Sequence, residues 1–437
     1  MAIIKPFRAL RPQPELVSQI ASPPYAVINR EEAYQMAKNN PCSFLHVSKA
    51  EIDLDSTVNH YDEKVYEKAR DNLSKLIKEK VYLKEEKETF YIYRQIMEGR
   101  TQTGLVVCAS IDDYLNGIIK KHENTRADKE EDRVKHIEYI DANTGLVFLT
   151  YKAKEGINRI ISKWIEVKSP VYDFTSEDRI THTCWIIDAE LIIQQLVNLF
   201  AKIDYFYIAD GHHRAAAGTK VGLKKREQFK NYTGKEEFNY FLSVLFPHNE
   251  LYIMEYNRVV ADLFGNSPEE FIRKISEKFT IKKYSDKSPY QPEAKHLFGM
   301  YLGNCWYKFT VKPGTFDEDD VVNSLDVSIL QNNLLAPILG VQDPRTEQRI
   351  EFVGGIRGLE ELERRVNSDM KVAFSLYPNS IEELMEIADA GKLMPPKSTW
   401  FEPKLRSGIF IHQLSEMGNG GEWGQAPQIP FGFHRRR

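Results

Sequence analysis

The residues best suited to chemistry lie in one short turn near the middle of the chain. Asp210, Gly211, His212, His213 and Arg214, here called the central turn, bring together a carboxylate, two imidazoles and a guanidinium. Glycine lets a backbone approach a ligand closely, and arginine forks onto the oxygens of a phosphate or carboxylate. We interpret the central turn as a binding site for an anionic ligand. The alternative is a tight turn whose histidines only cap or pack.

The elements that must position the central turn are predicted from the residues on either side. An apolar run from Ile203 to Ile208 comes before it and indicates a strand. Small helix-forming residues, Ala215 to Ala217, come after it. A helix that begins here presents unpaired backbone N–H groups and the positive end of its dipole. A strand, turn and helix in this order therefore favour a phosphate or another anion at the helix start.

A second candidate site follows a proline-rich segment near the N-terminus. Residues 22–28, Ser-Pro-Pro-Tyr-Ala-Val-Ile, lead to Asn29, which is typical of a helix cap. Glu31 and Glu32 then fall in the first turn of the predicted helix. A carboxylate there serves as a general base if it faces a substrate hydroxyl. The alternative is a favourable interaction with the helix dipole.

A third candidate site is the segment His122-Glu123-Asn124-Thr125. It offers hydrogen-bond donors, a carboxylate and a hydroxyl within reach of one ligand. The HExxH spacing of zinc proteases is absent. The alternative is solvated charge at the start of the helix that we expect from Arg126 to Ile140.

The fourth candidate is a loop stiffened by prolines, Met394 to Gly408, here called the Pro-rich loop. Its cationic and hydroxyl side chains are Lys397, Ser398, Thr399, Lys404 and Arg406. Fixed cations beside hydroxyl groups suit a phosphorylated or carboxylated ligand. The alternative is a rigid surface loop packed by Trp400 and Phe401.

Other signatures of metal and nucleotide sites are missing from the sequence. The four cysteines are scattered without a CxxC pair, so neither a zinc site nor a disulfide framework is indicated. His212 and His213 alone do not define a metal site, because no carboxylate–His spacing around them is diagnostic. GxxxxGK[ST] is absent and no GxGxxG follows the first strand, so nucleotide chemistry would require a different fold.

Composition narrows the class of protein. The chain has 437 residues, more than one hydrophobic core usually supports, with 42% hydrophobic and 28% charged residues. The net charge of −4 gives no sign of a nucleic-acid-binding surface. We find no apolar stretch of the roughly 18 residues that a membrane span needs. These features favour a cytoplasmic protein without a membrane partner.

The order of predicted elements indicates an α+β fold in two domains. We expect a first domain over 1–255, a second over 256–414, and a Gly-rich, basic tail over 415–437 that cannot bury a core. Within the first domain we predict a strand at Cys42 to Val47. We also predict a hairpin of Thr89 to Gln95 with Thr103 to Ile111.

These motifs together resemble a family of bacterial and archaeal proteins, the "domain of unknown function" family number ten-fifteen. The markers of the resemblance are residues 22–28, 122–125, 208–214 and 394–404, together with Asn257-Arg258-Val259-Val260. The N-terminal half is also similar to the ParB/sulfiredoxin superfamily, in which a related turn holds nucleotide phosphates. The resemblance thus implies a ParB/sulfiredoxin-like first domain. A sulfiredoxin activity is not expected, because the position of its cysteine is His213 here.

Within that superfamily the central turn resembles that of free serine kinases, which convert L-serine to O-phospho-L-serine with a nucleotide and magnesium. The resemblance implies a small-molecule kinase that uses ADP or ATP and Mg²⁺. Asp210 to Arg214 would bind the phosphates, and Asp210 and Glu123 would hold the metal. Glu32, His213 and Arg214 would be catalytic, with Glu31 or Glu123 as the other possible base. Substrate-binding residues would be His122, Glu123, Thr125, Lys397, Ser398, Thr399 and Lys404.

Two other functions remain open from the sequence. The first is a regulatory protein that binds a nucleotide or phosphate ligand without catalysis, using the same turn. The second is a nuclease, which rests on analogy of fold alone. The acceptor substrate, the choice between ADP and ATP, and the oligomeric state are not determined by the sequence.

Overall fold

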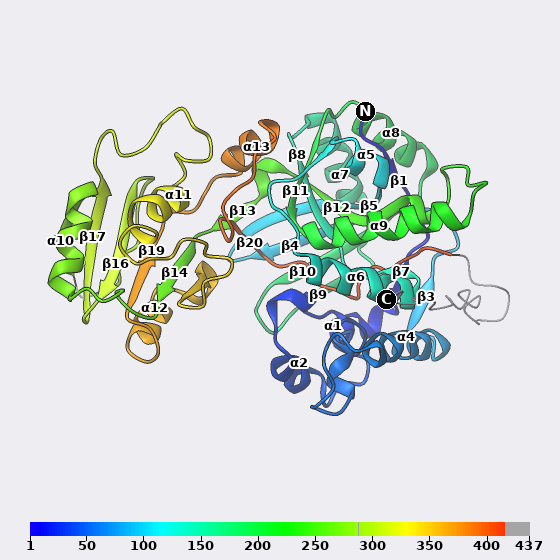
Figure 1. Cartoon of the computed structure of the whole chain (residues 1–437). Helices are drawn as coiled ribbons and strands as arrows, with labels where there is room; N and C mark the ends of the chain where they lie inside the picture. The colour runs from blue at the N-terminus through cyan, green and yellow to red at the C-terminus, as the bar shows by residue number, and fades with distance from the viewer. Residues whose placement is uncertain (287, 416–437) are drawn as a thin grey trace, which may run out of the picture.

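The structure, a computed structural model, describes residues 1–286 and 288–415. Two large sheets lie side by side, and a short pair of strands, β13 (Tyr252–Met254) with β20 (Trp400–Glu402), lies between them (Figure 1). The mixture of helices and mixed or antiparallel sheets confirms the α+β class predicted from the sequence. The expected tail over 415–437 lies outside the described residues, apart from Ser415.

The larger sheet carries the central turn at the end of one of its strands. Across the described chain it has nine strands in the order β6-β11-β8-β12-β5-β4-β10-β9, with β1 paired to β5. β8 is parallel to β12 and antiparallel to β11, so the sheet is mixed. The strands are β1 (Ile4–Lys5), β4 (Phe90–Met97), β5 (Arg100–Ser110), β6 (Ile119–Lys120), β8 (Val147–Tyr151), β9 (Tyr172–Thr175), β10 (Thr181–Ile187), β11 (Phe206–Asp210) and β12 (Tyr240–Pro247).

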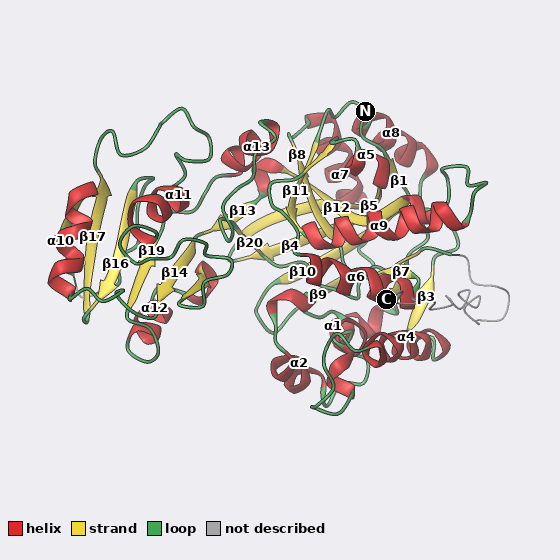
Figure 2. Cartoon of the chain, viewed as in Figure 1, coloured by secondary structure: helices red, strands yellow, loops and turns green. Residues whose placement is uncertain are grey.

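Helices cover the larger sheet because its strands bury side chains on both faces. Ile92, Val107 and Leu149 pack in one apolar cluster with residues of α7 and α8. α9 packs along α6 and against β12, and Figure 2 shows it crossing the sheet. The helices here are α5 (Ile111–Leu115), α6 (Ala127–Ile140), α7 (Glu155–Val167), α8 (Glu190–Phe200) and α9 (His212–Gln228).

A group of short elements near the N-terminus packs beside α6. α4 directs Val65, Ala69 and Leu73, which recur at helical spacing, into the apolar cluster of this group. The elements are α1 (Val17–Ile20), α2 (Arg30–Ala37), α3 (Leu45–Ser48), α4 (Glu63–Lys78), and the strand pair β2 (Leu10–Pro12) with β3 (Tyr82–Lys84).

The smaller sheet is wholly antiparallel and belongs to the second half of the chain. Within the described residues its strand order is β15-β17-β16-β19-β14-β18. The elements are β14 (Tyr256–Val260), α10 (Pro268–Lys278), β15 (Phe279–Lys283), β16 (Leu297–Leu302), β17 (Cys305–Val311), α11 (Asp326–Leu330), β18 (Ile350–Gly354), α12 (Glu360–Val366), β19 (Val372–Ser375) and α13 (Ile381–Asp389).

After α13 the chain returns to the larger sheet. β20 (Trp400–Glu402) pairs with β13 (Tyr252–Met254), and β21 (His412–Gln413) pairs with β7 (Ala142–Asn143). The ring of Phe410 lies 5.0 Å from that of Tyr91. The predicted limit near residue 255 falls between the two large sheets, but the segment 400–414 packs against the first half. The domain limits themselves stay a prediction.

One predicted strand is wrong and one predicted hairpin is confirmed. β4 and β5 form the expected hairpin. The expected strand at Cys42 to Val47 is instead a turn followed by α3, because Asn40 Oδ1 and Ser43 Oγ accept nearby backbone N–H groups at 3.2 and 3.3 Å. Such local hydrogen bonds compete with strand pairing. The apolar run is short, and a run of this length does not by itself distinguish a strand from a buried helix.

Candidate functional site

The central turn has the predicted order of strand, turn and helix. β11 ends at Asp210, Gly211 follows with a φ of +97°, and α9 begins at His212. A side chain at Gly211 would place its Cβ 2.7 Å from Arg214 Nε. Glycine is therefore required at position 211 for two reasons: the backbone is left-handed, and the guanidinium of Arg214 occupies the space of a side chain.

Two cations hold the carboxylate of Asp210. Arg214 Nη2 lies 3.5 Å from Asp210 Oδ1, and Lys404 Nζ lies 3.4 Å from Oδ2. Burial acts to raise the pKa of Asp210, but the charges of Lys404 and Arg214 outweigh it and hold the pKa well below its usual range. Asp210 is thus ionised, and it fixes two cations at the start of α9.

Arg214 also has unused hydrogen-bonding capacity. Its side chain is mostly buried, and its Nε has no hydrogen-bond partner in the described structure. A buried guanidinium N–H without a partner costs free energy, which a bound anion would recover. Arg214 therefore has a donor free for an oxygen other than those of Asp210.

His213 acts at the same helix start as a neutral donor. Its Nε2 accepts the backbone N–H of Arg126 at 3.0 Å. Burial is the largest cause that lowers the pKa of His213, with Arg214 adding to it. A neutral imidazole that accepts at Nε2 carries its proton at Nδ1. His213 therefore offers an N–H group at the central turn, and does not offer a positive charge.

The third sequence candidate meets the central turn in space. The rings of His122 and His212 lie 4.4 Å apart and nearly perpendicular, and His212 Nδ1 lies 3.9 Å from Glu123 Oε2. Burial lowers the pKa of His122 to about 4 and places that of His212 well below its usual value. Burial raises the pKa of Glu123, against the opposing charge of Lys397.

These groups open onto one large cleft of about 1000 Å³. The cleft is lined by side chains from the N-terminal elements, the larger sheet, the smaller sheet and the Pro-rich loop. The sequence-predicted site residues that line it are Asp210, Gly211, His212, His213, Arg214, His122, Glu123, Thr125, Lys397, Ser398, Thr399 and Lys404. The fold thus gathers three of the four sequence candidates and part of the N-terminal one.

Glu32, the predicted catalytic base, is not among the residues that line the cleft. Its carboxylate accepts the backbone N–H of Asn29 at 2.8 Å, and its own N–H donates to Asn29 Oδ1 at 2.9 Å. This reciprocal pair is a capping box at the start of α2. In the structure Glu32 is therefore part of the cap of α2, and its place in the first turn is also that of the helix-dipole interaction that was the alternative prediction from the sequence.

Parts of the other candidates are also used structurally. Arg406 lies outside the cleft lining and is bound by Asp178 and by Ser176 Oγ. The hydroxyl of Ser398 donates to the backbone oxygen of Pro395 at 2.6 Å. The hydroxyl of Thr125 donates to Glu130 at 2.7 Å. Lys404 Nζ, by contrast, lies 4.5 Å from the centre of the Trp400 ring and faces Asp210, so the Pro-rich loop contributes this cation directly.

Sequence reasoning missed several residues of the cleft. Arg133 projects from α6, binds Asp132, and lies 3.9 Å from the centre of the Tyr25 ring. Lys49 also belongs to the lining, and Tyr256 is contributed by β14 of the smaller sheet. For Arg133 the signal in the sequence was the high charge density of 126–140, which is equally typical of a solvated helix, and Lys49 and Tyr256 lie outside that stretch.

The mixed α+β fold and the residues of this cleft can now be set beside known proteins. The chain belongs to the family described as "Protein of unknown function (DUF1015)", which matches residues 4–328. This confirms the family resemblance drawn from the motifs. No curated protein matches the chain.

Three solved structures illustrate the similarity found among known folds. A free serine kinase in complex with AMP is 13% identical, with a TM-score of 0.36, and the match covers 71% of this chain and 93% of that chain. SbnI with a C-terminal truncation, from Staphylococcus aureus, is 12% identical, with a TM-score of 0.37, and the match covers 70% and 87%. A conserved hypothetical protein from Pyrococcus furiosus is 14% identical, with a TM-score of 0.34, and the match covers 73% and 97%.

The sequence contains no apolar stretch of the length that a membrane span needs, and the described helices of the structure agree with this. Within residues 1–286 and 288–415, no helix combines the length and the apolar character needed to cross a bilayer.

Proposed function

We propose that this protein is a nucleotide-dependent phosphotransferase that acts on a small hydroxyl metabolite, with free L-serine as the first acceptor to test. The observation that supports this most strongly is the convergence of the central turn with Lys397 and Lys404 on one cleft. Phosphoryl transfer depends mainly on positioning and on neutralising the charge of the phosphates. A helix start with a left-handed glycine, an arginine and two lysines supplies both.

In this proposal each side chain of the central turn has a defined task. The backbone N–H groups at the start of α9 and the guanidinium of Arg214 bind phosphate oxygens of ADP or ATP. His213 donates its Nδ1–H to an oxygen of the transferred group. Lys404 stays near Asp210 and lowers the negative charge that the phosphates meet on entering the cleft.

A divalent cation, Mg²⁺ in the serine kinases that the sequence resembles, fits the carboxylates of the cleft. Asp210 and Glu123 both line it, and Asp210 is ionised, so together they offer the oxygen ligands that such a cation requires. When bound, the cation would neutralise charge on phosphate oxygens. Of the two candidate glutamates, Glu123 is then the one whose substitution lowers turnover more, since the carboxylate of Glu32 is engaged in the capping box.

The direct test is to incubate the purified chain with Mg²⁺, L-serine and either ADP or ATP, and to measure O-phosphoserine. Nucleotide affinity is measured in parallel by calorimetry. We expect Arg214→Ala to weaken nucleotide binding at least about ten-fold, because it removes a charged donor from the phosphates. Arg226→Ala is the matched control, because Arg226 is also on α9 but pairs with Asp112 of α5, and both residues lie outside the cleft lining. Equal nucleotide affinity in both variants would contradict the proposed site.

One observation favours a second function, a regulator that binds a nucleotide or phosphate ligand without catalysis. The predicted base, Glu32, caps α2 and is not part of the cleft lining. Nucleotide binding that Arg214→Ala abolishes, with no product from a panel of hydroxylated amino acids, would support the regulator over the kinase.

A further inference from the structure

His122, Glu123 and His212 form a compact group of potential metal ligands at the edge of the cleft. One ligand atom of each residue lies within 4.8 Å of those of the other two. His122 and Glu123 are neighbours in the sequence, and His212 reaches them from the central turn. The two histidines are 3% and 5% exposed, whereas Glu123 is half-buried and gives access from the cleft.

The polar atoms of this group do not satisfy one another. His122 Nδ1 is fully buried and has no hydrogen-bond partner in the described structure. The backbone N–H of His122 reaches His212 Nε2 only at 3.5 Å, and the gap from His212 Nδ1 to Glu123 Oε2 is 3.9 Å. Both distances exceed the roughly 2.9–3.0 Å of a normal hydrogen bond. Unpaired buried polar atoms need a partner, and a metal ion bound between these side chains would provide one.

The orientation of His122 matches that of a metal-binding histidine. Its ring makes a hydrogen bond with the backbone of Ile208. Because Nδ1 has no partner, this bond uses Nε2, and the lone pair of Nδ1 is left free. Histidines that bind metals commonly anchor the other ring nitrogen on a backbone carbonyl or a carboxylate in this way.

We propose that His122, Glu123 and His212 bind a divalent transition-metal ion, of the class of Mn²⁺, Fe²⁺, Co²⁺ or Zn²⁺, with positions left open toward the cleft. Two imidazoles and one carboxylate suit these ions, whereas Mg²⁺ prefers oxygen ligands alone. Bond lengths of about 2.0–2.2 Å require the ligand atoms to approach to about 3–3.5 Å, which small side-chain rotations provide. This inference goes beyond the proposed function: the ligand group shares Glu123 with the Asp210–Glu123 pair proposed for Mg²⁺ but adds two imidazoles, and metal binding itself does not depend on phosphoryl transfer.

The test uses the full chain without a histidine tag, stripped by a chelator and without nucleotide. Zn²⁺ affinity is measured by competition with a chromogenic chelator, and Co²⁺ binding by its visible absorption. We expect one equivalent of either ion to bind, with a much lower affinity for Mg²⁺. His212→Asn and Glu123→Gln should each weaken Zn²⁺ binding by about 100-fold or more, since loss of a supporting residue alone costs about 10–100-fold.

His213→Asn is the matched control, because His213 belongs to the same turn but not to the ligand group. It should change Zn²⁺ affinity by no more than a few-fold. Circular dichroism of the metal-free variants checks folding, and Glu123→Gln, at a half-buried position, provides a variant that folds if His212→Asn does not. Absence of stoichiometric Zn²⁺ or Co²⁺ binding, or equal affinity in wild type and Glu123→Gln, would overturn the proposal. Nucleotide binding measured separately in Mg²⁺ shows whether the proposed function fails with it.

Discussion

Gly211 determines how closely an anion can approach the start of α9. Its φ of +97° is a conformation that other residues adopt only with strain, and the space beside its Cα is filled by Arg214. The same small residue therefore sets the backbone direction and permits the guanidinium to lie across the turn. Any side chain here has to displace Arg214 or distort the helix start.

We predict that Gly211→Ala weakens nucleotide binding by at least about ten-fold and lowers stability by about 1 kcal/mol. Gly234→Ala separates the two effects, because Gly234 has a φ of +89° and no heavy atom within 4 Å of an added Cβ. This control should show the backbone strain with nucleotide binding intact. Calorimetry and thermal unfolding check the pair. Parallel loss of binding in both variants would show that displacement of Arg214 is not the cause.

Glu123 and Glu32, the two candidate catalytic carboxylates, should differ in how much turnover falls when each is changed to glutamine. We predict that Glu123→Gln lowers turnover by about 100-fold, because it removes a carboxylate from the cleft. Glu32→Gln should retain turnover within about two-fold, because glutamine also serves in a capping box. Steady-state kinetics of the two variants decide the matter. A large loss in Glu32→Gln with α2 still folded would mean that Glu32 leaves the cap during the reaction.

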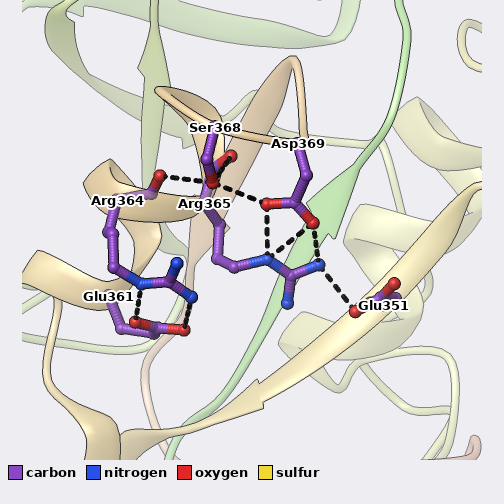
Figure 3. A network of polar contacts seen from close by, with 6 residues as sticks. All are labelled: Glu351, Glu361, Arg364, Arg365, Ser368 and Asp369. Atoms are coloured by element: carbon purple, nitrogen blue, oxygen red, sulfur yellow. Dashed lines mark hydrogen bonds and ion pairs between the residues drawn. The ribbon is translucent and has the colours of Figure 1, made fainter.

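At the scale of elements, α12 is tied to the smaller sheet by a network of charged side chains (Figure 3). Arg365 binds Asp369 at 2.7 Å and reaches Glu351 of β18 at 2.6 Å, and its side chain is 14% exposed. Arg364 pairs with Glu361 on the same helix and is 63% exposed. The first arginine joins a helix to a strand, whereas the second joins two residues of one helix.

This difference predicts unequal costs of truncation. Arg365→Ala should destabilise the second half of the protein by about 1 kcal/mol, because a packed side chain and a network are lost together. Arg364→Ala should leave unfolding unchanged within error, because an exposed pair on one helix contributes little. Urea unfolding checks both variants. The prediction is wrong if Arg364→Ala is the more damaging change.

At the scale of the whole molecule, the segment after α13 joins the two halves. Its strand β20 pairs with β13, its Lys404 reaches Asp210, and Arg406 binds Asp178. Beneath it, His182 is buried with Nδ1 at 2.8 Å from Tyr93 Oη. Burial is the main cause that lowers the pKa of His182 to about 3, with Arg406 adding to it and Asp178 opposing.

His182 should make stability depend on pH. Its folded pKa of about 3 is below the ordinary 6.5, so the unfolded chain binds the extra proton between these values. Its contribution is complete above pH 6.5 and is lost as pH falls toward 3, at up to about 1.4 kcal/mol per pH unit. His182→Gln should reduce that slope between pH 6 and 4 (about the middle of this window). Urea unfolding across this range checks it, and identical slopes for wild type and variant would contradict the prediction.

The sequence by itself determined the family, the α+β class and the order of strand, turn and helix at Asp210 to Arg214. These follow from local features: hydrophobic periodicity, a glycine where a left-handed backbone is needed, and a run of charged and polar residues that marks the turn between two apolar elements. The local pattern failed at Cys42 to Val47, where side-chain hydrogen bonds to the nearby backbone replaced strand pairing.

Only the tertiary structure decided which candidates share a cleft. Sequence spacing does not show that Glu123 lies near His212, because the order of strands in the larger sheet brings them together. Nor does it show that Lys404 lies near Asp210, because the return of the chain after α13 brings that pair together. The sequence named Glu123 as a metal residue but not its grouping with His122 and His212, because His212 lies far along the chain from the other two. For Glu32 a short-range interaction was decisive. The sequence predicted that its carboxylate faces the cleft, whereas in the structure it forms the capping box with Asn29.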